Sequence, residues 1–149
     1  MTKLKAILFG AIETNSKAGD GALAFTRAAL GIFMLVGHGF GKLHPDRFAR
    51  FVKSTAAMGF PLPTLFAGGA VAAETLFALL LAVGLVTRVS AGVLSFNMLV
   101  AAFVAHAANP WFGASPRDPS KEAALLYLVP FLLFTVLGGG RYSADRFAR

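Results

Sequence analysis

The chain has 149 residues and a net charge of +7, and 56% of its residues are hydrophobic while only 14% are charged. Soluble domains carry about 25% charged residues, so this composition argues against a water-soluble domain and favours a membrane protein. The absence of cysteine excludes disulfides, thiol chemistry and cysteine-ligated metal centres. The basic residues lie beside apolar runs, where they meet lipid head groups, which argues against nucleic-acid binding.

Four apolar runs dominate the chain, and each is close to the ~20 residues that cross a hydrocarbon core of ~30 Å. They cover residues 23–43, 64–86, 89–107 and 121–138. Lipid offers no partners for backbone N–H and C=O groups, so each run is expected to be a helix. We therefore predict one all-α integral membrane domain over residues 1–149, a bundle of four transmembrane helices.

Two short amphipathic segments accompany the predicted spans. Residues 4–12 have one apolar helical face, which predicts a short N-terminal helix lying on the membrane surface. A turn-rich link over residues 15–21 is expected to lead into the first span, and residues 141–149 to form a basic tail. Residues 47–58 alternate Arg47, Arg50 and Lys53 with apolar side chains. This pattern favours an interfacial helix with its basic side toward head groups, the alternative being a lid over a site between the helices.

The first span carries an unusual polar stripe. At about 100° per residue, Arg27, His38 and Lys42 fall within roughly 60° of one another on a helix. A soluble amphipathic helix is polar over a much wider arc. The narrow stripe therefore indicates a membrane helix that turns its polar side toward other parts of the protein.

Glu74, near the middle of the second span, is the most informative acidic residue. A charge at mid-bilayer costs roughly 2.5–3.5 kcal/mol, so this carboxylate needs a partner or a proton. Arg27 and Asn97 are expected at a depth that allows contact with it. We interpret Arg27, Glu74 and Asn97 as a central polar group, which either fixes helix packing or lines a pocket for a small ligand or a proton. A lipid-facing Glu74 is the third alternative.

A second polar group is expected near the opposite membrane surface, formed by His38, Lys42, His106 and Glu122. At this depth His38 and Lys42 can donate hydrogen bonds to a quinone head group, and Glu122 can accept a proton. The alternatives are side chains that extend toward the head groups, or a haem ligated by His38 and His106. The three histidines and the acids are too scattered along the chain to predict a metal site.

Motifs spread along most of the chain resemble those of the DoxX family. They are Arg27, GIFMLVGHGFGKL (31–43), GFPLP (59–63), Ala73-Glu74, GLVTR (84–88), Asn97-Met98, Val100-Ala101, Lys121-Glu122 and GGGRYSAD (138–145). The resemblance implies a small four-helix protein of the bacterial inner membrane. Some relatives are subunits of thiosulfate:quinone oxidoreductase and others accompany membrane oxidoreductases, so it also implies a redox setting.

Our first hypothesis is a membrane subunit of a redox system that binds quinone or a similar lipophile between its helices. The alternatives are a transporter of a small solute or proton, and a non-catalytic assembly partner that packs through Gly37 and Gly41. These three hypotheses leave open whether the chain is itself an enzyme. Membrane lipids, an oxidoreductase subunit and a second copy of the chain are the expected partners. Flanking basic residues, with Arg27 included, favour cytoplasmic termini.

Overall fold

The computed structural model describes residues 3–115 and 118–148, and these residues form helices and turns with no strand. The elements are α1 (Lys3–Phe9), α2 (Lys17–Met34), the π-helical turn η1 (Leu35–Gly39), α3 (Phe40–Lys42), α4 (Pro45–Ala57), α5 (Pro63–Ala72), the π-helical turn η2 (Ala73–Phe77), α6 (Ala78–Val83), α7 (Thr87–Val100), the π-helical turn η3 (Ala101–Ala105), α8 (Glu122–Leu137) and the 3₁₀ turn η4 (Ala144–Phe147). The predicted all-α class is confirmed.

Three continuous helices have the length and apolar composition needed to cross a membrane: Lys17–Lys42, Pro63–Val83 and Thr87–Ala105. The fourth apolar helix, α8, has 16 residues. At 1.5 Å per residue it is about 24 Å long, shorter than a hydrocarbon core of ~30 Å. The structure therefore confirms three long apolar helices and one shorter one, and a count of four spans depends on α8.

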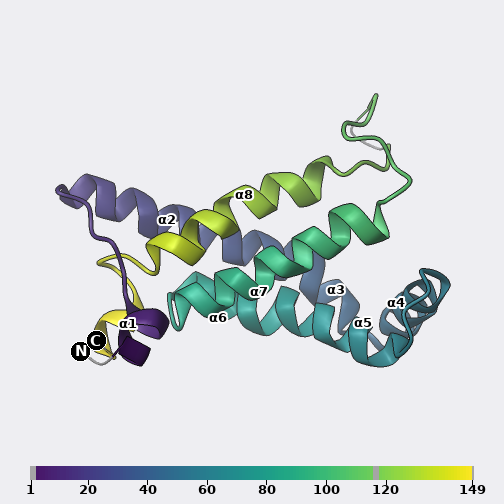
Figure 1. Ribbon diagram of the computed structural model, residues 1–149, viewed down its shortest axis with the longest axis horizontal. Helices are drawn as coiled ribbons and strands as arrows, with labels where there is room; N and C mark the ends of the chain where they lie inside the picture. Colours follow the sequence, from purple (N-terminus) through teal and green to yellow (C-terminus); the bar gives the residue numbers. More distant parts are fainter. Residues whose placement is uncertain (1–2, 116–117, 149) are drawn as a thin grey trace.

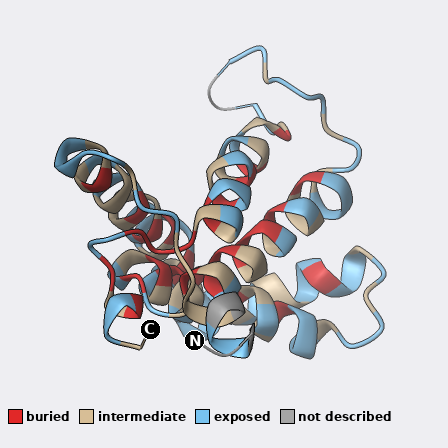
Figure 2. Ribbon diagram, turned by 60° about the vertical axis from the view of Figure 1, so that its left-hand side comes forward, coloured by how far each residue is buried: buried red, intermediate tan, exposed pale blue. Residues whose placement is uncertain are grey.

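The helices form a bundle whose two ends differ. Both termini lie at one end, and α4 lies at the opposite end (Figure 1). Helices α7 and α8 pack side by side, and α2 packs against α6. The centre holds large buried side chains, including Met34, Leu81, Leu94 and Phe131, while exposed residues cover the outward faces of the long helices (Figure 2). Phe25 and Leu126, which are 76% and 68% exposed, show how apolar these outer faces are.

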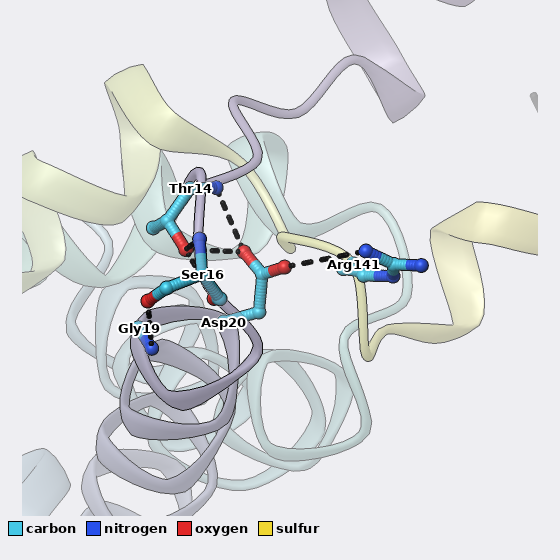
Figure 3. Close-up of polar contacts among 5 residues, drawn as sticks. All are labelled: Thr14, Ser16, Gly19, Asp20 and Arg141. Atoms are coloured by element: carbon cyan, nitrogen blue, oxygen red, sulfur yellow. Dashed lines mark hydrogen bonds and ion pairs between the residues drawn. The ribbon is translucent and has the colours of Figure 1, made fainter.

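The first long helix begins earlier than the sequence pattern predicts. It starts at Lys17, where the Ser16 hydroxyl accepts a hydrogen bond from the backbone N–H of Gly19, a standard N-terminal cap. The buried Asp20 carboxylate accepts from Thr14 and lies 3.9 Å from the Arg141 guanidinium (Figure 3). The predicted link over residues 15–21 is therefore wrong, because its polar residues start the helix.

The segment expected to be a basic tail is instead folded against the bundle. Asp145 is fully buried, and its two carboxylate oxygens accept hydrogen bonds from the backbone N–H groups of Val86 (2.6 Å) and Thr87 (3.0 Å). The backbone N–H of Asp145 donates to the carbonyl of Gly84 at 2.8 Å. Asp145 thus caps α7 from a distant part of the chain, which the basic composition of this segment does not predict.

The N-terminal segment also packs at this end. Helix α1 contacts α7, and the backbone N–H of Ile12 donates to the carbonyl of Leu137 at 2.8 Å. The expected short N-terminal helix is therefore present as α1, and its placement on a membrane surface stays a prediction.

Candidate functional site

A cavity of about 710 Å³ lies in the half of the bundle away from the termini. Its wall is formed by residues of η1, α3, α4, α5, η2, α7, η3 and α8, and most of these residues are apolar. Its polar or ionisable lining includes His38, Lys42, Glu74, Asn97, His106 and Tyr127. Pockets that bind small molecules are commonly about 300–1,000 Å³ and mostly apolar with a few polar groups. The cavity has the size and composition of such a pocket.

Glu74 is the acidic group of this cavity, and Lys42 is its ionic partner. The Lys42 ammonium lies 2.5 Å from the Glu74 carboxylate, and the Asn97 side-chain amide donates to its other oxygen at 3.4 Å. The Glu74 side chain is 7% exposed and that of Lys42 is 27% exposed. Glu74 therefore points inward, and Lys42 from the predicted surface group completes its network.

Three π-helical turns surround the same cavity. The turn η1 contains His38, η2 contains Glu74, and η3 contains Ala101 and Ala105, all of which line the cavity. A π-helical turn adds a residue to the helical repeat and is frequently found at functional sites. The turns shift the side chains that follow them around the helix axis, so a wheel drawn at a constant 100° per residue misplaces some of these groups.

The first long helix approaches Glu74 closely because Gly39 has no side chain. A β-carbon at Gly39 would collide with the backbone carbonyl of Glu74 and would lie 2.7 Å from the Thr75 methyl carbon. Gly31, two turns earlier, faces the Ala78 carbonyl in the same way. Close packing at Gly39 brings Lys42, three residues later, within reach of Glu74.

Arg27 is not part of the cavity, although the sequence grouped it with Glu74. Its guanidinium donates to the backbone carbonyls of Leu81 (2.6 Å), Ala82 (2.7 Å) and Tyr142 (2.9 Å). The residue is 3% exposed. The last carbonyls of a helix lack partners within the helix, and Arg27 supplies partners at the end of α6. It therefore joins α2, α6 and the C-terminal segment.

The predicted surface group is only partly assembled. His38 and His106 line the cavity with Lys42, whereas Glu122, in the first turn of α8, does not line it. His106 pairs through Nδ1 with the side-chain amide nitrogen of Asn109 at 3.0 Å. An amide nitrogen only donates, so Nδ1 accepts and the proton of the neutral ring is on Nε2.

Tyr127 escaped the sequence analysis, whereas α4 was considered there only as an alternative, a lid over a site between the helices. Tyr127 of α8 lies edge-on to the His38 ring, with 5.4 Å between the ring centroids. Helix α4 contributes Phe51, Thr55 and Met58, and the Lys42 ammonium lies 4.5 Å from the centre of the Phe51 ring. The spacing of these three residues by four and three positions marks one helical face, which was the available signal.

No three histidine, aspartate or glutamate residues gather to hold a metal ion within the ranges 3–115 and 118–148. The cavity also has no cysteine, because the chain contains none. Its chemistry therefore depends on an amine, a carboxylate, an amide, two imidazoles, a phenol and the hydroxyl groups of Ser54 and Thr55, all of which form hydrogen bonds.

Long apolar helices whose ionic side chains turn toward a shared interior define a multi-pass helical membrane protein. A family model named DoxX matches residues 22–107. This match covers more than half of the chain, and the protein belongs to the DoxX family. The matched stretch contains Lys42, Glu74 and Asn97, whereas α8 and the C-terminal segment follow it. Searches of curated proteins and of solved structures gave no match to the chain.

Proposed function

We propose that this protein is a membrane subunit of a redox system and that it binds quinone or a similar lipophile in the central cavity. The observation that carries the proposal is the Lys42–Glu74–Asn97 network in the wall of an otherwise apolar cavity. The redox setting is supported by membership of the DoxX family, some of whose members are subunits of a thiosulfate:quinone oxidoreductase.

The energetics of the network favour a binding role. Removing two charges from water costs several kcal/mol per ion, and their attraction only partly offsets that cost. Polar contacts between helices in a membrane average roughly 0.6 kcal/mol. The gain in helix packing is therefore too small to account for the cost of an ion pair at this position. Binding of a ligand with polar atoms does account for it.

The route into the cavity suits a lipophile. Leu65, Phe66 and Phe96 line the cavity and are also exposed on the outside of the bundle, at 67%, 45% and 68%. In a bilayer such apolar outer surfaces face the acyl chains. A ligand dissolved in the membrane can thus enter between α5 and α7 without crossing water.

The polar groups suit a quinone head in both redox forms. The Lys42 ammonium and the Asn97 amide nitrogen can donate hydrogen bonds to the carbonyl oxygens of a quinone. The Glu74 carboxylate can accept a hydrogen bond from a hydroxyl group of a hydroquinone.

We place the protein in the bacterial inner membrane with cytoplasmic termini.

In this proposal α8 is the fourth span. Its packing along α7 and its apolar composition support this placement. A short span is accommodated by local thinning of the bilayer or by flanking side chains that extend to the interface.

The test is to purify the protein in mild detergent, extract it with organic solvent and look for quinone by absorbance. Binding of decylubiquinone is then measured in nanodiscs of neutral phosphatidylcholine, with empty nanodiscs subtracted. We expect Glu74→Gln to weaken binding by about tenfold or more, the loss of one charged hydrogen bond. Glu122→Gln, which changes an acid outside the cavity, should bind as the wild type does. Absence of extracted quinone together with undetectable decylubiquinone binding would exclude the proposal.

A further inference from the structure

Helix α4 has two faces with different surroundings. One face carries Phe51 and Thr55, which line the cavity, and Thr55 is only 3% exposed. The other face carries Arg47, Arg50 and Lys53, which are all exposed. Among the ion pairs found in the described residues, none includes these three basic side chains. One helix thus separates the cavity from a basic surface.

The ends of α4 suit a wall that can move as a unit. Pro45 begins the helix after His44 in an extended conformation, and Gly59 follows its end with φ of +87°. A positive φ is readily adopted only by glycine among common residues, so the chain turns sharply there. The elements that pack most extensively against α4 are α3 and α5, its neighbours along the chain.

Lys42 links this wall to the ion pair in the cavity. Its ammonium contacts the Glu74 carboxylate and also lies over the Phe51 ring of α4, 4.5 Å from the ring centre. An ammonium over an aromatic face is attracted by the ring quadrupole. Displacement of α4 therefore removes a contact of the residue that neutralises Glu74.

We propose that Arg47, Arg50 and Lys53 bind the phosphate groups of anionic lipids, and that this contact holds α4 closed over the cavity. Basic residues at a membrane surface are attracted to anionic head groups, and three of them on one short helix act together. The lipid charge then regulates how readily the cavity opens. The inference rests on the proposed function only in taking the cavity as the binding site.

The test uses the natural absence of cysteine, since Thr55→Cys gives the chain a single thiol behind α4. Its rate of maleimide labelling is measured in nanodiscs of phosphatidylcholine, with and without phosphatidylglycerol. We expect phosphatidylglycerol to slow labelling on the order of tenfold, the scale of a few basic residues near an anionic surface. Combining Arg47→Gln, Arg50→Gln and Lys53→Gln should abolish this difference.

Two controls isolate the closure of α4. Ala57→Cys lies on the same helix but is exposed and outside the cavity wall, so its labelling reports the effect of lipid charge on thiol reactivity alone. Lys17→Gln combined with Arg146→Gln removes two basic residues at the other end of the bundle and should leave the lipid effect intact. Circular dichroism of every variant confirms that it is folded.

The proposal is overturned if Thr55→Cys, corrected by Ala57→Cys, labels equally fast or faster with phosphatidylglycerol. Persistence of the slowing in the variant with all three basic residues changed also overturns it. The labelling assay contains no quinone, so its result is independent of whether decylubiquinone binds. A lipid effect without decylubiquinone binding would reject the proposed function and keep the inference.

Discussion

The two ends of the bundle use polar residues in opposite ways. At the end with the termini, Arg27 and Asp145 bond to backbone carbonyls and N–H groups of other elements. At the other end, Lys42 and Glu74 bond to each other in the wall of a cavity. The first arrangement satisfies helix ends, where backbone groups lack partners. The second leaves side-chain polar atoms beside open space, where a ligand can reach them.

This difference distinguishes polar residues that join backbone segments from polar residues that line a cavity. Arg27 and Glu74 are both charged residues whose burial in a membrane helix costs free energy, but only Glu74 lines the cavity. A polar side chain whose donors go to several backbone carbonyls holds the chain together. One whose partners are other side chains at a cavity can exchange them for a ligand.

Asp145→Ala should have the largest effect on stability. It leaves the partly buried backbone N–H of Val86 and the buried N–H of Thr87 without acceptors, and each unsatisfied group costs about 1–3 kcal/mol. We expect the free energy of unfolding in detergent to fall by about 3 kcal/mol, measured by circular dichroism. Asp145→Asn keeps one acceptor oxygen and should lose about half as much. Equal stability of wild type and Asp145→Ala would show that the C-terminal segment is not part of the fold.

Arg27→Lys should come next, with a loss of about 2 kcal/mol in the same unfolding assay. A lysine ammonium cannot reproduce the planar guanidinium that reaches three carbonyls in two segments, α6 and the C-terminal segment. Binding of decylubiquinone by the folded variant should be unchanged, because Arg27 is not in the cavity wall. A loss of binding comparable to that of Glu74→Gln would place Arg27 back in the site.

Gly39→Ala should destabilise by about 1.5 kcal/mol, since the added methyl group forces apart two closely packed backbones. Gly37→Ala is the matched control, because no atom lies within 4 Å of a β-carbon there. It should be neutral or slightly stabilising, as alanine favours helix over glycine. The two variants are compared by thermal unfolding in one detergent, and equal midpoints would contradict the close approach of η1 and η2.

Glu74→Ala should have the smallest effect on stability, within about 1 kcal/mol, because Lys42 is partly exposed and can turn toward the interface. It should nevertheless impair function or assembly more than Glu122→Ala. Decylubiquinone binding and unfolding are measured on the same preparations. Equal tolerance of both substitutions would show that Glu74 is not part of a binding site. The proposed difference in role between the two ends of the bundle would then be wrong.

Much of the helical architecture follows from the sequence, because apolar runs of membrane length have few other structures available in lipid. The inward position of Glu74 and its contact with Asn97 also follow from helical periodicity and the cost of a buried charge. The folded position of the C-terminal segment could not be predicted from the sequence. It depends on Asp145 capping α7 at Thr87, which is 58 residues away along the chain. Composition carries no information about so distant a contact.

The sequence by itself determined an all-α chain with long apolar helices, and it marked Glu74 as a residue that needs a partner. The tertiary structure alone decided which cation that partner is. Three π-helical turns rotate the helices away from a regular repeat, and Gly39 lets two backbones meet beside Glu74. Local sequence sets helix formation, but only packing between distant helices sets which side chains face one another, and here it selected Lys42 over Arg27.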